Sequence, residues 1–121
     1  MDKVNDLKKY ERVFKMPFKT IYDAYITKVN KKNYSSLEVN QIIKWFTSYN
    51  EIELEDYINN KTYLEFLEGI KTLPKNYQII TGKICGIKLS ELYEPLIIRC
   101  RYLDKLIDEL YKGKSLEKLI R

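Results

Sequence analysis

The sequence predicts an all-α protein, a single compact bundle of about six helices packed at varied, orthogonal-type angles. Three observations support this fold class. Apolar residues recur three and four positions apart along most of the chain, which is the spacing of one helix face. Capping boxes, in which a serine, threonine or asparagine precedes a glutamate by three positions, begin three of the apolar segments. Prolines interrupt the pattern at segment boundaries.

The chain has 121 residues, enough for one domain with its own core. We expect residues 17–121 to form this domain. Residues 1–16 are expected to be an N-terminal extension or a docking helix, because Val4, Leu7 and Phe14 lie roughly on one helical face.

The first helix of the domain is expected after Pro17, with its apolar face formed by Phe18, Ile21, Tyr22, Tyr25 and Val29. Each of the next three helices is expected to begin at a capping box: Ser35 with Glu38, Asn50 with Glu53, and Thr62 with Glu65. Pro74 ends the last of these helices.

Residues 77–88 fit two structures. Their isoleucines have helical spacing, but Gly82 and Gly86 would each cost about 1 kcal/mol inside a helix relative to alanine. Residues 78–81 could instead form a short strand. We favour a short helix because no second strand candidate exists to pair with this one, and glycines four apart would then let another backbone approach closely.

The longest helix is predicted over residues 95–112, near the centre of the bundle. Pro95 suits the first helical position, Glu94 precedes it as N-cap, and Gly113 ends the helix. The apolar stripe of this helix contains Leu96, Cys100, Leu103, Ile107 and Leu110.

The opposite side of this helix is charged over roughly 140°. It carries Arg101, Asp104, Lys105, Asp108, Glu109 and Lys112. The simpler interpretation is a solvated face, with Lys105 paired to Asp108 or Glu109 and Asp108 paired to Lys112. The alternative is a polar site or internal network centred on Arg101 and Asp104.

The composition excludes several kinds of chemistry. Histidine is absent, and Cys85 and Cys100 form no metal-binding motif, so we predict no metal and no cofactor. We expect both cysteines to be packed, reduced thiols of a cytoplasmic protein. No apolar stretch is long enough to span a membrane, and the N-terminus does not resemble a signal peptide. Residues 81–83 could bind an anion at a helix start, although Gly82 and Gly86 form no phosphate-loop motif.

The net charge of +5 raises the question of nucleic acid. A helix-turn-helix is conceivable over residues 37–59, but its second helix is acidic, so phosphates would repel it. Weak binding through the basic N-terminal third stays open as a third hypothesis, with Lys8, Lys9, Arg12, Lys15 and Lys19 as the contacts.

Residues 80–86 form an Ile-Thr-Gly-x-Ile-Cys-Gly run, and distinctive charged motifs follow at residues 101–106, 108–110 and 112–114. By this run and by these motifs, which match nearly without change, the chain from Tyr22 to Arg121 resembles a small uncharacterised prokaryotic family, Domain of Unknown Function 2200. Tyr22, Tyr25 and Lys28 fit part of a Tyr-Pro-Leu-Tyr-x-x-Lys pattern, and residues 45–49 resemble a Trp-Leu-Thr-Gly-Tyr run in which Ser48 replaces the glycine. The resemblance implies a compact all-α fold. It does not suggest an activity, because none is assigned to the family.

The function is therefore predicted only by class. The favoured hypothesis is a non-catalytic module that binds another protein or itself, and no small-molecule ligand is identified. The alternative is a small enzyme with a pocket near residues 81–86 and Arg101. The candidate interaction or network residues are Arg101, Asp104, Lys105, Asp108, Glu109, Lys112, Thr81, Gly82, Cys85 and Gly86.

Overall fold

The computed structural model describes residues 3–75, 77 and 80–120. Seven α-helices are found in this part of the chain: α1 (Glu11–Phe14), α2 (Phe18–Asn30), α3 (Ser36–Thr47), α4 (Glu51–Asn60), α5 (Tyr63–Glu68), α6 (Pro95–Tyr111) and α7 (Leu116–Leu119). Two 3₁₀ helices, η1 (Leu7–Tyr10) and η3 (Leu89–Glu91), and a small hairpin of β1 (Lys83–Ile84) and β2 (Ile87–Lys88) complete it. The predicted compact, mostly helical fold is confirmed.

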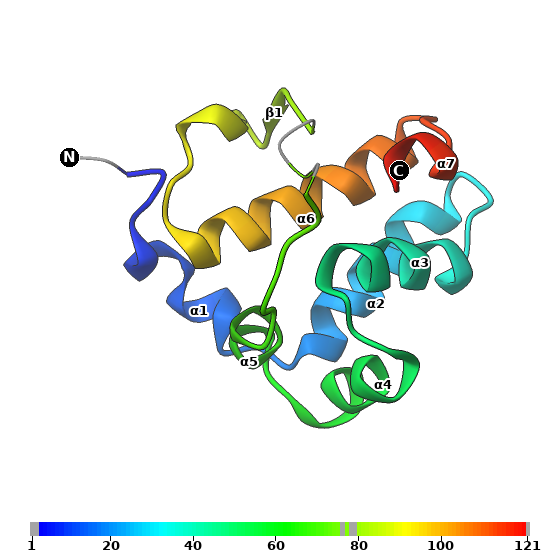
Figure 1. Ribbon diagram of the computed structural model, residues 1–121, viewed down its shortest axis with the longest axis horizontal. Coiled ribbons are helices and arrows are strands. Elements are labelled where there is room, and N and C mark those ends of the chain that lie inside the picture. The colour runs from blue at the N-terminus through cyan, green and yellow to red at the C-terminus, as the bar shows by residue number, and fades with distance from the viewer. Residues whose placement is uncertain (1–2, 76, 78–79, 121) are drawn as a thin grey trace.

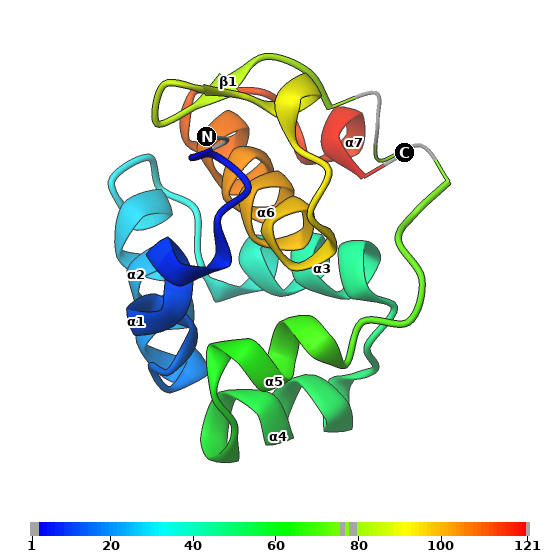
Figure 2. The same ribbon diagram turned by 90° about the vertical axis from the view of Figure 1, so that its left-hand side faces the viewer.

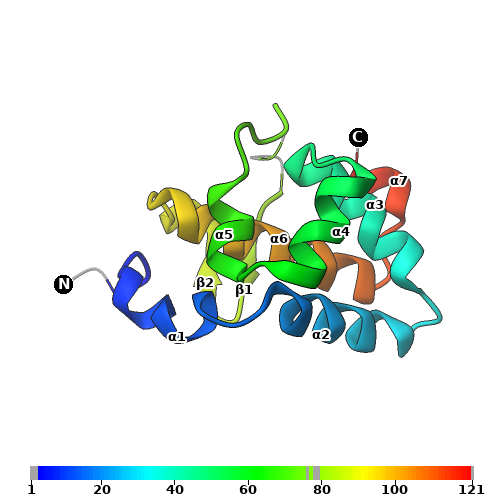
Figure 3. The ribbon, with the colours of Figure 1, turned by 90° about the horizontal axis from the view of Figure 1, so that it is seen from below.

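Helix α6 lies between the hairpin and the other long helices (Figures 1 and 2). It packs against α2, α3, α5 and α7 and against β1. Seen from below, α2 runs along one edge of the molecule, beside α4 and α5 (Figure 3). The predicted apolar stripe of α6 is buried at Cys100, Leu103, Ile107 and Leu110. The tertiary packing thus leaves the charged side of α6 facing α2, the N-terminal segment and the hairpin.

The helix boundaries follow the predicted caps. All three capping boxes form, at Ser35, Asn50 and Thr62, with both the side-chain and the reciprocal glutamate bond present. The Glu94 carboxylate accepts a hydrogen bond from the Ile97 amide at 2.9 Å, which satisfies a first-turn donor of α6. Because these bonds are made between near neighbours in sequence, the sequence could predict them.

The N-terminal segment is attached to the start of α6. The Asn5 side chain donates to the Glu91 carbonyl oxygen at 3.0 Å and accepts from the Tyr93 amide at 2.8 Å. Tyr10 and Phe14 are buried, whereas Leu7, which we placed on the same face, is 41% exposed. The segment therefore forms one wall of the space beside α6.

The predicted short helix over residues 77–88 is wrong where the structure describes it. Lys83 pairs with Lys88 and Ile84 with Ile87 in an antiparallel hairpin. The two turn residues, Cys85 and Gly86, have φ angles of 51° and 79°, the left-handed pair that a two-residue hairpin turn requires. The strand considered from the sequence, residues 78–81, precedes both observed strands, which have only two residues each and therefore show no alternating pattern. Residues 78 and 79 of the alternative strand lie outside the described residues.

Two further expectations for this segment are corrected. Cys85 lies at the hairpin tip and is exposed, so it is not a packed thiol. A Cβ on Gly86 would meet nothing within 4 Å, so this glycine supplies a positive φ rather than close packing.

Among the described residues, no helix is long and apolar enough to cross a membrane.

Candidate functional site

The interpretation of the charged side of α6 as a solvated face is wrong. Lys105 is 6% exposed and Asp108 is 8% exposed. The Lys105 ammonium forms an ion pair with Glu109 at 2.8 Å, as predicted from their spacing, and donates to the Lys83 carbonyl oxygen at 3.0 Å. The second bond links the middle of α6 to β1. Helix α2 and the hairpin thus cover a network that a helix alone would leave in water.

The lower part of this network joins α6 to α2. Asp108 accepts from Lys112 at 2.9 Å, the predicted pair, and from Lys28 of α2 at 2.9 Å. Burial by itself would raise the pKa of Asp108, but the hydrogen bonds from Lys112 and Lys28 outweigh it and bring the pKa below the usual value. The ammonium groups of Lys28 and Lys32 also lie over the Tyr111 ring.

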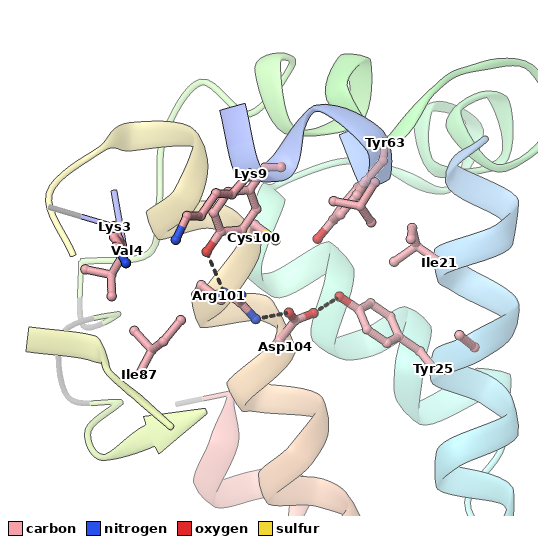
Figure 4. Close-up of a pocket in the computed structure, with 13 residues that line it drawn as sticks. Lys3, Val4, Lys9, Ile21, Tyr25, Tyr63, Ile87, Cys100, Arg101 and Asp104 are labelled. Atoms are coloured by element: carbon pink, nitrogen blue, oxygen red, sulfur yellow. Dashed lines mark hydrogen bonds and ion pairs between the residues drawn. The ribbon is translucent and has the colours of Figure 1, made fainter. Parts of the chain in front are cut away.

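The upper part of the network contains the second aspartate. Asp104 accepts a hydrogen bond from the Tyr25 hydroxyl at 2.6 Å, and its other oxygen lies 3.8 Å from a terminal nitrogen of Arg101 (Figure 4). Burial raises the pKa of Asp104, and the Tyr25 bond and the Arg101 charge offset this only in part. Two aspartates one helical turn apart therefore have pKa values shifted in opposite directions.

These opposite shifts predict opposite effects of pH on stability. The lowered pKa of Asp108 gives stability that is present above the unfolded-state pKa of about 4 and is lost as the pH falls through the folded-state value. The raised pKa of Asp104 gives a contribution that is complete below about pH 4 and is lost as the pH rises through its folded-state value. We expect Asp108→Asn to weaken the loss of Tm on acidification and Asp104→Asn to steepen it. Thermal melts from pH 3 to 7 give the slope of Tm against pH for each variant. If both variants changed this slope in the same direction relative to the wild type, the opposite pKa shifts would be contradicted.

Arg101 and Asp104 open onto a cleft of about 510 Å³. Its walls come from the N-terminal segment with η1, from α1, α2, α5 and α6, and from β2, so no single stretch of sequence encodes it. Aliphatic side chains supply much of the lining, including Val13 and Ile21. Arg101 is held in place at this cleft because its Nε donates to the Tyr10 hydroxyl at 2.9 Å.

One polar atom in the cleft wall lacks a hydrogen bond of normal length. Tyr63 is 1% exposed, and its hydroxyl has no partner within hydrogen-bonding distance in the described part of the chain, although the Cys100 thiol and the Tyr25 hydroxyl lie near it. This hydroxyl points into the space between Cys100 and Tyr25 (Figure 4). A buried hydroxyl without a partner costs about 1–3 kcal/mol, so such an atom calls for an explanation.

The cysteine of the cleft is a poor nucleophile. Burial raises the pKa of Cys100 to about 12, with a further contribution from the nearby Asp104 charge. At neutral pH the group is therefore the thiol, whereas the thiolate is the reactive form. This agrees with the predicted role of Cys100 as a packed residue on the apolar stripe.

The structure divides the predicted site residues among five places. Arg101 and Asp104 line the cleft. Lys105, paired with Glu109, bonds to the hairpin, and Asp108, paired with Lys112, bonds to Lys28 of α2. Thr81 and Gly82 line a separate hollow of about 350 Å³, together with Tyr102, while Cys85 and Gly86 form the exposed hairpin tip. In the part of the chain that the structure describes, residues 81–86 and Arg101 thus do not line one common pocket. Within the described residues, no group of three metal-ligating side chains is found.

Sequence reasoning missed three tyrosines of the cleft: Tyr10, Tyr25 and Tyr63. Tyr25 lies on the predicted apolar face of the helix after Pro17, and Tyr63 directly follows the Thr62 cap; an aromatic ring at such a position indicates the core. Their rings are indeed buried, but the Tyr25 hydroxyl bonds to Asp104 and the Tyr63 hydroxyl points into the space beside it (Figure 4). Only Tyr25 carried a further signal, its place in the pattern that resembles Domain of Unknown Function 2200.

A protein family described as "Uncharacterized protein conserved in bacteria (DUF2200)" matches residues 12–121. The chain belongs to the DUF2200 family. A solved structure, the crystal structure of uncharacterized protein SP1917, is similar to this DUF2200 protein with a TM-score of 0.82 and 33% sequence identity, covering 90% of each chain. No curated protein matches the chain. The resemblance stated from the C-terminal motifs is confirmed, and the biochemical function of this DUF2200 protein is not established by these similarities.

Proposed function

We propose that this DUF2200 protein is a non-catalytic binding module, and that the cleft beside Arg101 is its binding site. The observation that carries the proposal is the Tyr63 hydroxyl, which is buried in the cleft wall without a hydrogen-bond partner among the described residues. The hydroxyl is covered in the free protein, so a ligand that moves the side chains over it and bonds to it would remove its desolvation penalty. The cleft volume of about 510 Å³ also lies within the range of small-molecule sites, roughly 300–1,000 Å³.

The proposal keeps the partner class inferred from the sequence, which is another protein or a second copy of this chain. Either partner would place one anchoring group in the cleft and bury the surface around it. A mass measurement in solution separates the two cases, because a second copy doubles the mass and another protein leaves the isolated chain a monomer.

The test is a fragment titration of ¹⁵N-labelled protein, using benzyl alcohol, benzylamine and benzoate as neutral, cationic and anionic probes. We expect amide shifts to cluster at residues that line the cleft, such as Val13, Ile21 and Arg101. Ala24→Phe adds a ring at the cleft wall and should remove these shifts, whereas Thr81→Val, in the separate hollow, should leave them unchanged. Shifts that concentrate outside the cleft, or no shifts at millimolar probe, would refute the proposed site.

A second candidate, a small enzyme, is favoured by one observation. Asp104 is a carboxyl with a raised pKa that faces a cleft, which is a common property of general acids and bases. The first measurement for this candidate is the pKa of Asp104 by carboxyl ¹³C NMR. A value at or below the usual carboxyl pKa of about 4 would contradict the raised pKa on which the enzyme candidate rests.

A further inference from the structure

We infer that the cleft binds a carboxylate group carried on an apolar body. This inference rests on the proposed function and names the chemical class of ligand that the site takes. Three features of the cleft support it: an excess of positive charge, an arginine with unused donors, and an apolar lining around a single unpartnered hydroxyl.

The ionisable lining of the cleft is mostly cationic. Its lining includes three cationic side chains, Arg101, Lys3 and Lys9, and one carboxylate, Asp104. Asp104 is already bonded to Tyr25, and 27% of its side chain is exposed. A ligand with one negative charge therefore meets a net positive site, and a cationic ligand is disfavoured.

Arg101 has donors left for such a ligand. Its Nε is used by Tyr10, whose ring also lies 5.1 Å from the guanidinium carbon. The nearest Asp104 oxygen is 3.8 Å from Nη1, which is an ion-pair distance and too long for a hydrogen bond. The terminal nitrogens thus have no close acceptor among the described residues. Tyr10 holds the guanidinium in position, which lowers the entropy cost of forming a forked contact with a carboxylate.

The rest of the cleft suits the body of the ligand. Tyr63 offers one hydroxyl, while Val4, Val13, Ile21 and Ile87 provide aliphatic contacts. A fully hydrated anion such as inorganic phosphate would leave these contacts unused. An apolar acid would bury its body against them and direct its carboxylate to Arg101.

Two sources share this chemistry: a free organic acid and the C-terminal carboxylate of a partner peptide that ends in an apolar residue. The test therefore uses two sets of matched probes. Hexanoate is compared with 1-hexanol and hexylamine, which keep the six-carbon body and change the head group. The peptide acetyl-Ala-Ala-Leu-Leu is compared as the free acid and the C-terminal amide.

We expect at least one acid to bind roughly tenfold or more tightly than its matched uncharged probe, measured by calorimetry and by amide shifts at the cleft. The acid that binds more tightly identifies the source. Tighter binding of the peptide acid indicates a protein partner, whereas tighter binding of hexanoate indicates a small molecule and would overturn the partner class in the proposed function.

Four variants test the assigned groups. Arg101→Gln should weaken binding of the acid roughly ten- to a hundredfold and leave hexanol binding unchanged. Arg101→Lys keeps the positive charge but loses the two parallel N–H donors of the guanidinium, so its affinity for the acid should lie between those of the wild type and Arg101→Gln. Tyr63→Phe should weaken the acid several-fold without lowering Tm, because the hydroxyl has no partner to lose in the free protein. Asp104→Asn should strengthen acid binding, because it removes the one like charge.

Arg99→Gln is the matched control, since it removes the same charge from the same helix but outside the cleft, where Arg99 donates to the Leu67 carbonyl oxygen. It should leave the affinity for the acid unchanged. If all probes bind the cleft with equal affinity, or if Arg101→Gln has no more effect than Arg99→Gln, the inference is wrong and the proposed function stands. If no probe shifts the amides of the cleft, both are wrong.

Discussion

Phe66→Ala should lower the free energy of unfolding by about 3–5 kcal/mol. Phe66 is fully buried and its ring stacks on Phe18, with the ring centroids 3.9 Å apart and the planes 8° from parallel. The rings of Tyr49, Tyr57 and Tyr63 also pack against it. Removal of the Phe66 ring therefore leaves a cavity at the contact between α2, α4 and α5, and these rings cannot all move to fill it. Urea unfolding followed by circular dichroism measures the loss.

The control for this prediction is Ile52→Ala, which removes a large apolar side chain that is 80% exposed. We expect that variant to stay within about 0.5 kcal/mol of the wild type. The loss of unfolding free energy in Phe66→Leu should lie between those of Phe66→Ala and Ile52→Ala, because leucine fills part of the space that the ring leaves. A Phe66→Ala variant as stable as Ile52→Ala would contradict the packing described for α5.

Lys105→Met should lower the free energy of unfolding by roughly 1–3 kcal/mol. Methionine keeps most of the length of the side chain, so the change isolates the ammonium group. Its loss leaves the Lys83 carbonyl oxygen and the Glu109 carboxylate without their shared donor. Because that donor joins β1 to α6, we also expect amide hydrogens of the hairpin to exchange faster.

Lys114→Met provides the comparison for Lys105→Met, since Lys114 is exposed just beyond α6. It should change neither the free energy of unfolding nor the exchange rates of the hairpin. Equal effects of the two substitutions would mean that Lys105 acts only through the net charge of the protein. Faster exchange in the Lys105 variant alone would show that the contact with β1 stabilises the hairpin.

The sequence by itself determined the helices that begin at predicted caps and the family, but not the hairpin of β1 and β2. The caps at Ser35, Asn50, Thr62 and Glu94 are bonds between residues two or three positions apart, so their residue types and spacing are enough to predict them. The Lys105–Glu109 and Asp108–Lys112 pairs followed from the same local geometry. The motifs of residues 80–86 and 101–114 pointed to the family in the same direct way.

Only the tertiary structure decided how the charged side of α6 is used. Asp104 meets Tyr25 and Asp108 meets Lys28, partners about eighty positions away in the chain. The cleft likewise combines Tyr10, Tyr63 and Arg101, whose sequence patterns indicate core or surface positions but no common site. Periodicity shows which side of a helix is apolar, but it does not show which element covers the polar side. The covering elements are the hairpin, α1 and α2. They determine the burial of Lys105 and Asp108, the opposite pKa shifts of the two aspartates and the covered Tyr63 hydroxyl.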